Sequence, residues 1–272
     1  MDAATVRSDM QRAFGDVSVS VKRRDDKSVL DELRQAGCLK ARFPRNDNAG
    51  WLNVVTLNTS GGIAGGDELR SLFTIGPAAS ATIAGQAAER FYRALPDTPA
   101  SIVQTRIVVT TGGAAEWLPQ EMILFDGCRV QRSLRVELAE DARFLGIESL
   151  VFGRAAMGEV VNRGSLRDVI ELCRGGRLLL HDAVRLHGEV AAKLRRKAVA
   201  DGARALATII YVAPDPEVML EPLRRLGIGA SVWDGMLIAR MLGATGAVLR
   251  GTVVDALQVL RGGRPLPRVW LC

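Results

Sequence analysis

Apolar and polar residues alternate with a period of two in several short runs between residues 41 and 187. In 129-RVQRSLRVEL-138, the apolar positions 130, 134, 136 and 138 share one face, and the charged positions 129, 135 and 137 share the other. This alternation is typical of a strand with one buried face. Further β-rich runs lie at 52–57, 102–110 and 121–125, and turn signals such as Gly112-Gly113 separate the runs. The pattern predicts an extensive β structure.

The last third of the chain adds helices to this pattern. The runs 166–172 and 177–186 predict a hairpin through Gly175-Gly176, and 206–212 and 230–242 predict strands. A helix is expected over 217–226, with Asp215 as its N-cap and Pro216 at its first position. A second, amphipathic helix is expected over 244–260. Its apolar stripe consists of Leu249, Val253, Leu257 and Leu260.

No linker rich in proline or serine interrupts the chain, and we predict a single domain over residues 1–272. The first 20 residues have a mixed polar composition, and we expect them to be disordered. They contain no apolar run of the length of a signal peptide, and no stretch of the chain approaches the length of an apolar membrane span. The four cysteines form no CxxC pair. This set suits a reducing compartment, so we expect a cytoplasmic protein.

The net charge of +6 changes the picture of possible partners. A basic surface favours acidic partners, which include nucleic acids, anionic membranes and acidic protein surfaces. The dense basic runs are short, at 22–24 and 193–197, and each is interpreted as a solvated face. Aromatic residues make up 5% of the chain, too few for stacking platforms along a groove.

The loop 58-NTSGGIAGGD-67 has four glycines behind a predicted strand, as a phosphate-binding loop would. A P-loop requires lysine and a hydroxyl residue after its last glycine, but Asp67 and Glu68 stand there. These two carboxylates would repel a phosphate, so nucleotide binding is not expected. The glycines are interpreted as positions of positive φ in turns or bulges between strands.

Few other residues in the sequence suggest catalysis or metal binding. The two histidines, His181 and His187, lie on one face of a single predicted strand, and no nucleophile motif or zinc-ligand spacing is present. We therefore predict that the protein is not an enzyme. Five carboxylates stand in apolar or small-residue segments: Asp67, Glu89, Glu116, Glu121 and Glu159. They either pair with nearby arginines such as Arg154 or line a wet passage for a divalent cation, and the residues leave both readings open.

Six segments in order resemble the family of the urease accessory protein UreD, also called UreH. They are 58-NTSGGIAGGD-67, 86-QAAERFYRA-94, 116-EWLPQEMILF-125, 152-FGRAAMGE-159, 205-ALATIIYV-212 and 265-PLPRVW-270. The resemblance implies a mostly β fold, an extended β-helix-like stack of short strands with two α-helices in the C-terminal third. It also implies a water-filled tunnel inside the protein.

By the same resemblance, the chain is expected to be a urease maturation factor without catalytic activity or a tightly bound cofactor. It would dock with UreF and the GTPase UreG on apo-urease, in two copies per complex, and help to deliver nickel. Asp67, Glu89, Glu116 and Glu159 are the expected contacts of Ni²⁺ in transit. The mean hydropathy of +0.11 and the late amphipathic segments indicate more apolar surface than one monomer can bury, so residues 215–270 are expected to contribute to the UreF interface. The alternative is a basic, β-rich nucleic-acid-binding protein, whose affinity would fall steeply with salt.

Overall fold

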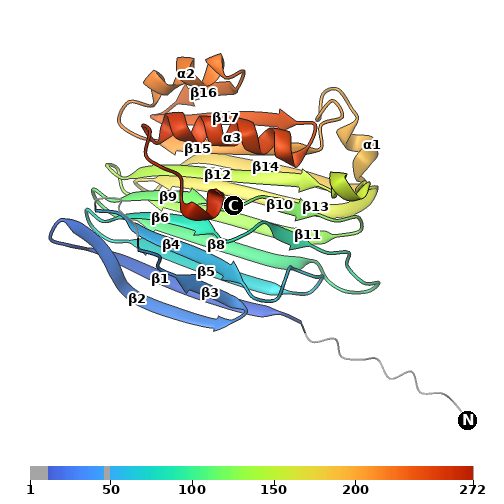
Figure 1. Cartoon of the computed structure of the whole chain (residues 1–272), viewed down its shortest axis with the longest axis horizontal. Helices are drawn as coiled ribbons and strands as arrows, with labels where there is room; N and C mark the ends of the chain where they lie inside the picture. Colours follow the sequence, from blue (N-terminus) through green and yellow to red (C-terminus); the bar gives the residue numbers. More distant parts are fainter. Residues whose placement is uncertain (1–11, 46–49, 272) are drawn as a thin grey trace, which may run out of the picture.

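The computed structural model describes residues 12–45 and 50–271, and it consists of two β-sheets and a layer of helices (Figure 1). The seven-stranded sheet contains, in spatial order, β14 (Arg177–Glu189), β13 (Arg163–Arg174), β11 (Arg129–Leu138), β8 (Ser101–Val109), β5 (Glu68–Ile75), β1 (Phe14–Arg24) and β2 (Lys27–Gly37). The main path of the ten-stranded sheet contains β16 (Gly229–Trp233), β17 (Met236–Gly243), β15 (Ala205–Val212), β12 (Arg143–Phe152), β9 (Ala114–Leu118), β6 (Ser80–Gly85), β4 (Leu52–Asn58) and β3 (Leu39–Arg42). Beside this path, β10 (Met122–Leu124) pairs with both β12 and β7 (Glu89–Phe91).

The chain passes back and forth between the sheets as it proceeds from β4 to β13. Strands β8, β11 and β13 enter the seven-stranded sheet, and β6, β9 and β12 enter the ten-stranded sheet, each parallel to the preceding strand of its own sheet. Strand β5 joins the seven-stranded sheet parallel to β1. Parallel neighbours require a crossover connection, and here the strand in the opposite sheet supplies it. The prediction of a mostly β structure with stacked short strands is confirmed.

Two apolar cores hold the layers together. The larger core fills the space between the sheets, and the smaller core lies between the outer face of the ten-stranded sheet and the helices. The side chains of α3 (Gly246–Leu260) that enter the smaller core include Leu249, Val253, Leu257 and Leu260, which is the predicted stripe. The Thr245 hydroxyl accepts a hydrogen bond from the backbone N–H of Val248 and caps this helix.

The predicted helix over 217–226 divides into a 3₁₀ turn, η2 (Pro216–Met219), and the short helix α2 (Leu220–Arg225). Asp215 stands before the 3₁₀ turn, but its side chain makes no capping hydrogen bond there. Pro222 is tolerated because it falls in the first turn of α2, where its missing N–H leaves no hydrogen bond unmade. A further helix of five residues, α1 (Val190–Leu194), follows β14 and was not predicted.

Two expectations about local structure are wrong. Residues 230–242 form a hairpin of β16 and β17 rather than one strand, because Asp234 and Gly235 adopt φ angles of 50° and 70°. Two successive residues of positive φ make the tight turn that joins antiparallel strands. Residues 14–20 are not disordered, since they form β1 and pair with β5. Residues 1–11 lie outside the described part of the chain, as do residues 46–49 and Cys272.

No helix in the described part of the chain combines the length and apolar composition needed to cross a membrane.

Candidate functional site

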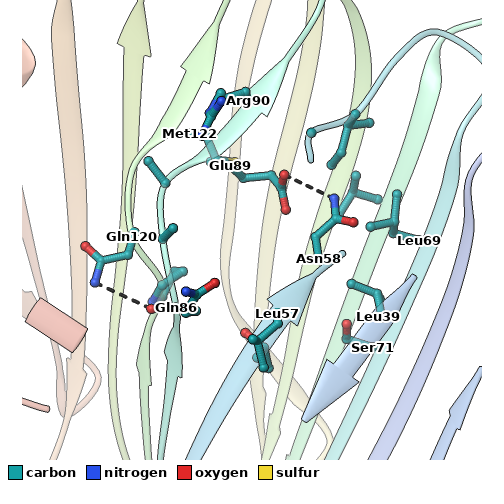
Figure 2. Close-up of a pocket in the computed structure, with 18 of the residues that line it drawn as sticks. Leu39, Leu57, Asn58, Leu69, Ser71, Gln86, Glu89, Arg90, Gln120 and Met122 are labelled. Carbon is teal, nitrogen blue, oxygen red and sulfur yellow. Dashed lines mark hydrogen bonds between the residues drawn. The ribbon is translucent and has the colours of Figure 1, made fainter. Parts of the chain in front are cut away.

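A cavity of about 250 Å³ lies between the two sheets and is lined from both sides. Strands β4, β6, β7, β9, β10 and β12 reach it from the ten-stranded sheet, and β5, β8 and β11 reach it from the seven-stranded sheet. Figure 2 shows Asn58, Gln86, Glu89 and Gln120 among apolar neighbours in this cavity. Polar side chains that line a space between sheets are the feature that water or an ion would use.

The glycine-rich loop forms part of the wall of this cavity through Gly61, Gly62 and Ile63. Gly61 and Gly62 have φ angles of 79° and 140°, and a Cβ atom on Gly62 would overlap the ring of Tyr92. The predicted turn role of these glycines is confirmed. Asp67 ends the loop and accepts hydrogen bonds from the backbone N–H groups of Ala64, at 2.7 Å, and Ala13, at 2.9 Å. Both oxygens of this buried carboxylate therefore hold the loop in place.

Glu89 of β7 is the predicted carboxylate that lines the cavity. The amide of Asn58 donates a hydrogen bond of 3.1 Å to its Oε1, and Glu89 forms no ion pair with any described residue. Burial raises the pKa of Glu89 to about 7, although the Asn58 amide and the backbone N–H of Arg90 favour the ionised form. Near neutral pH this side chain is therefore present in both protonation states.

Replacing Glu89 with glutamine is expected to stabilise the protein at alkaline pH. The pKa of Glu89 is about 7 in the folded state against 4.5 ordinarily, so between these values the folded chain holds a proton that the unfolded chain has lost. The free energy of unfolding of the wild type therefore falls as pH rises through this window, by about 3 kcal/mol in total. Urea unfolding near pH 5 and near pH 8 measures this: the advantage of Glu89→Gln should grow with pH. An advantage that does not change with pH would contradict the assignment.

A buried charge cluster forms the inner part of the cavity and joins the sheets. Arg132 of β11 contacts Glu148 of β12 through both terminal nitrogens, with one hydrogen bond of 2.8 Å, and its Nη1 lies 3.4 Å from Oδ1 of Asp168 on β13. Trp117 of β9 donates a hydrogen bond of 2.7 Å to Glu148. Burial raises the pKa of both Glu148 and Asp168, and Arg132 opposes that rise.

Sequence reasoning missed this cluster, although one signal was present. Position 132 belongs to the inward face of the run 129–138, between the apolar positions 130 and 134, and an arginine there breaks the alternation. A charged residue on a buried face requires a buried partner, but the sequence does not name that partner.

Glu116 of β9 points to the opposite side of the ten-stranded sheet, toward the end of α3. Arg261 donates two hydrogen bonds of 3.0 Å to its carboxylate, Arg264 donates another, and the Thr82 hydroxyl donates one of 2.6 Å. Glu116 lines a separate hollow of about 740 Å³ and not the cavity between the sheets. Its contacts are those of a carboxylate that fastens α3 to the sheet.

Glu159 lies in the loop that follows η1 (Ala155–Met157). Its carboxylate accepts a hydrogen bond of 2.7 Å from Arg154 and one of 3.3 Å from the backbone N–H of Asp126. Partial burial opposes ionisation, but the Arg154 guanidinium outweighs it and the pKa of Glu159 is lowered. The arginine pairing that the sequence left open is found here and at Glu116, and Glu121 pairs with Arg250 at 2.8 Å.

The structure thus brings Glu89 to the cavity and gives Asp67, Glu116 and Glu159 other partners. Within the described residues, no three His, Cys, Asp or Glu side chains form a group suited to holding a metal ion. The role of the four carboxylates in the passage of Ni²⁺ stays a prediction, and its geometric support rests on Glu89.

Comparisons with known proteins agree over nearly the whole chain. A family model described as the UreD urease accessory protein matches residues 13–271. A urease accessory protein UreD from Methylobacterium sp. (strain 4-46) is 43% identical over 252 residues, which cover 89% of this chain and 88% of the relative. One from Azorhizobium caulinodans is 41% identical over 266 residues, covering 96% and 97%, and one from Sinorhizobium medicae is 40% identical over 269 residues, covering 96% of both.

Proposed function

The chain belongs to the UreD family of urease accessory proteins, with a role in urease maturation, and we propose that it serves there as a non-catalytic scaffold that helps deliver nickel. Two kinds of observation support the proposal. Relatives at 40–43% identity bear the name urease accessory protein UreD, and a partly polar cavity lies between the sheets, with a carboxylate, Glu89, that forms no ion pair with the described residues. The alternative of a nucleic-acid-binding protein has no support from these relatives.

We propose that Ni²⁺ passes through the cavity between the sheets with part of its water shell, as cargo and not as a resident cofactor. A volume of about 250 Å³ accommodates several water molecules, since each occupies about 30 Å³ in the liquid. The Glu89 carboxylate offers oxygen ligands, which suit hard and borderline cations. Since the pKa of Glu89 is about 7, an arriving cation competes with a proton for the carboxylate and is therefore bound only weakly. A conduit requires such weak binding, because a deep well would trap the ion.

The other charged groups would support this passage without binding the ion directly. Asp67 fixes the glycine-rich loop that forms one wall of the cavity. At the inner end, Arg132 faces two carboxylates, and when both are ionised the cluster carries one net negative charge, which favours a cation.

We propose further that UreF, the GTPase UreG and apo-urease are the partners, with two copies of this chain in the complex. The GTP site belongs to UreG, in keeping with the absence of a phosphate lysine after the glycine-rich loop. Region 215–270 has exposed apolar side chains available for UreF, among them Val218 at 62%, Leu242 at 57% and Val248 at 59% exposure. Apolar side chains that remain exposed in one subunit are candidates for an interface.

The nickel content of urease from cells that express all urease components tests the proposal. We expect nickel per active site to fall to background when this chain is absent, and to fall several-fold with Glu89→Gln, because the neutral amide cannot take on the charge of the ion. Glu68→Gln is the matched control, since Glu68 is half-exposed and pairs with Arg70 away from the cavity. Co-purification of the partners must be unchanged in both variants.

Full nickel loading without this chain would overturn the delivery role. If Glu89→Gln fails only because the complex does not assemble, Glu89 is a structural residue and the passage needs another route.

A further inference from the structure

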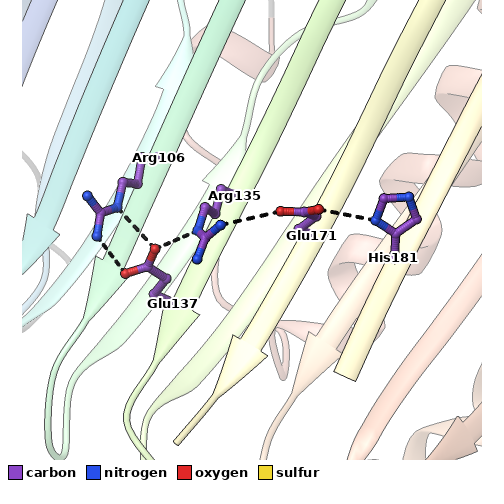
Figure 3. A network of polar contacts seen from close by, with 5 residues as sticks. All are labelled: Arg106, Arg135, Glu137, Glu171 and His181. Atoms are coloured by element: carbon purple, nitrogen blue, oxygen red, sulfur yellow. Dashed lines mark hydrogen bonds and ion pairs between the residues drawn. The ribbon is translucent and has the colours of Figure 1, made fainter. Parts of the chain in front are cut away.

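The outer face of the seven-stranded sheet has one row of charged side chains that neutralise one another (Figure 3). Glu137 accepts hydrogen bonds from Arg106, at 2.7 and 3.1 Å, and from Arg135, at 2.7 Å. Arg135 lies 3.5 Å from Glu171, which in turn contacts His181 at 3.2 Å. Two arginines and two carboxylates thus alternate across β8, β11 and β13 in this row.

The same face carries a second group of cations without such compensation. Arg167 of β13 lies directly opposite Arg185 of β14, and Ser165 lies opposite His187 one step further along the pair. Together with Lys193 of α1, these side chains line an open hollow of about 540 Å³. We call the group of Arg167, Arg185 and Lys193, together with the neighbouring His187, the cationic patch, and its positive charge comes from the two arginines and the lysine.

The cationic patch contains no carboxylate, and its two arginines are unpaired. Among the described residues, the side chains of Arg167 and Arg185 form no hydrogen bond and no ion pair, and both are exposed. Like charges directly opposite each other on neighbouring strands repel and destabilise the pairing. A local arrangement that weakens the sheet without compensation inside the chain is expected where a surface serves a function.

We propose that the cationic patch docks a short acidic segment of a partner protein, whose carboxylates supply the missing counter-charges. Paired guanidinium groups suit this role, because each can donate two parallel hydrogen bonds to a carboxylate. Strand β14 is the first strand in the order of its sheet, so the patch lies at a sheet edge that a partner can reach.

The surroundings of the patch favour an acidic peptide over a nucleic acid. None of the residues lining the hollow is a phenylalanine, tyrosine or tryptophan, so bases would find no stacking surface. A carboxylate lies on each side of the patch along the strand pair. Glu189 lies opposite Arg163 on one side, and Glu171 lies opposite His181 on the other. Both carboxylates are themselves paired, Glu189 with Arg163 at 2.8 Å and Glu171 with Arg135 at 3.5 Å, so the uncompensated positive charge on this strand pair is confined to the stretch between them, which matches a short acidic segment.

The binding of a fluorescein-labelled peptide of alternating glutamate and glycine to the full-length chain, followed by fluorescence anisotropy at low salt, tests this inference. We expect Arg167→Gln/Arg185→Gln to weaken binding at least about ten-fold. The matched control, Arg106→Gln/Arg135→Gln, removes the same charge from the neutralised row and should weaken binding less than about two-fold. Arg185→Gln alone should keep or raise the thermal midpoint, because it relieves repulsion, and this shows that the variant folds.

Equal losses in the two double variants would overturn the proposal, since net charge alone would then explain binding. Failure of the wild type to bind the peptide, or patch-dependent binding that is tighter for a single-stranded oligonucleotide of equal charge, would also overturn it. The experiment needs neither nickel nor urease, so its failure leaves the proposed delivery role untouched.

Discussion

Replacing Arg261 with methionine is expected to lower the free energy of unfolding by about 3–5 kcal/mol. The Arg261 side chain has 0% exposure and the Glu116 side chain 2%, and two hydrogen bonds of 3.0 Å join them. Methionine fills most of the space but leaves the Glu116 carboxylate with only Thr82 and Arg264. An incompletely compensated buried charge is the physical source of the loss.

Denaturant unfolding of the purified variant measures this effect. Arg224→Met is the matched control, because Arg224 forms an exposed pair with Glu221 at 3.2 Å, and such pairs contribute at most about 1 kcal/mol. The double variant Glu116→Leu/Arg261→Met should recover much of the stability, since it removes both charges together. A loss below about 1 kcal/mol for Arg261→Met would show that Arg264 compensates Glu116 without help.

Arg132→Met is expected to cost a similar amount, about 3–5 kcal/mol near pH 8, and clearly less near pH 5. Arg132 is the cation between Glu148 and Asp168, and burial already raises the pKa of both carboxyl groups. Without the guanidinium their pKa values rise further. The folded variant then holds protons that its unfolded chain releases, so its free energy of unfolding falls as pH rises.

Unfolding of the wild type and Arg132→Met at the two pH values measures the difference. Arg106→Met, which removes an exposed arginine from the outer face of the same sheet, should cost little and show no such pH dependence. A cost for Arg132→Met that is equal near pH 5 and pH 8 would mean that the two carboxyl groups do not take up protons in the variant.

The elements that sequence analysis located correctly are those set by local patterns. The alternation in 129–138 became β11, the stripe of Leu249, Val253 and Leu257 became the buried face of α3, and Gly175-Gly176 became the turn between β13 and β14. The turn at Asp234-Gly235 was missed because the apolar residues on both sides read as one continuous strand. An Asp-Gly pair between two apolar runs is nevertheless a strong hairpin signal, because both residues readily adopt positive φ.

The sequence predicted which types of residue form the candidate site, but it did not predict how these residues are placed relative to one another. Glu89, Glu116 and Glu159 all stood out as carboxylates in apolar or small-residue surroundings. Only Glu89 faces the cavity, because β7 lies beside β10 at the space between the sheets, whereas Glu116 points to the helix layer. Which side of a sheet a residue faces depends on the register of the whole stack, and a single run of residues does not contain that information.

By itself, the sequence determined the family, the β character of the chain, the two main helices of the last third and the turn role of the glycine-rich loop, because each depends on motifs or on neighbours within a few residues. Only the tertiary structure decided which charges meet. Arg261 and Glu116 are 145 positions apart, and Arg132, Glu148 and Asp168 come from three strands in two sheets. It likewise decided that Arg106 and Arg135 have ion-pair partners, whereas Arg167 and Arg185 have none within residues 12–45 and 50–271. Charges act through space, and the stacking of the sheets sets those distances.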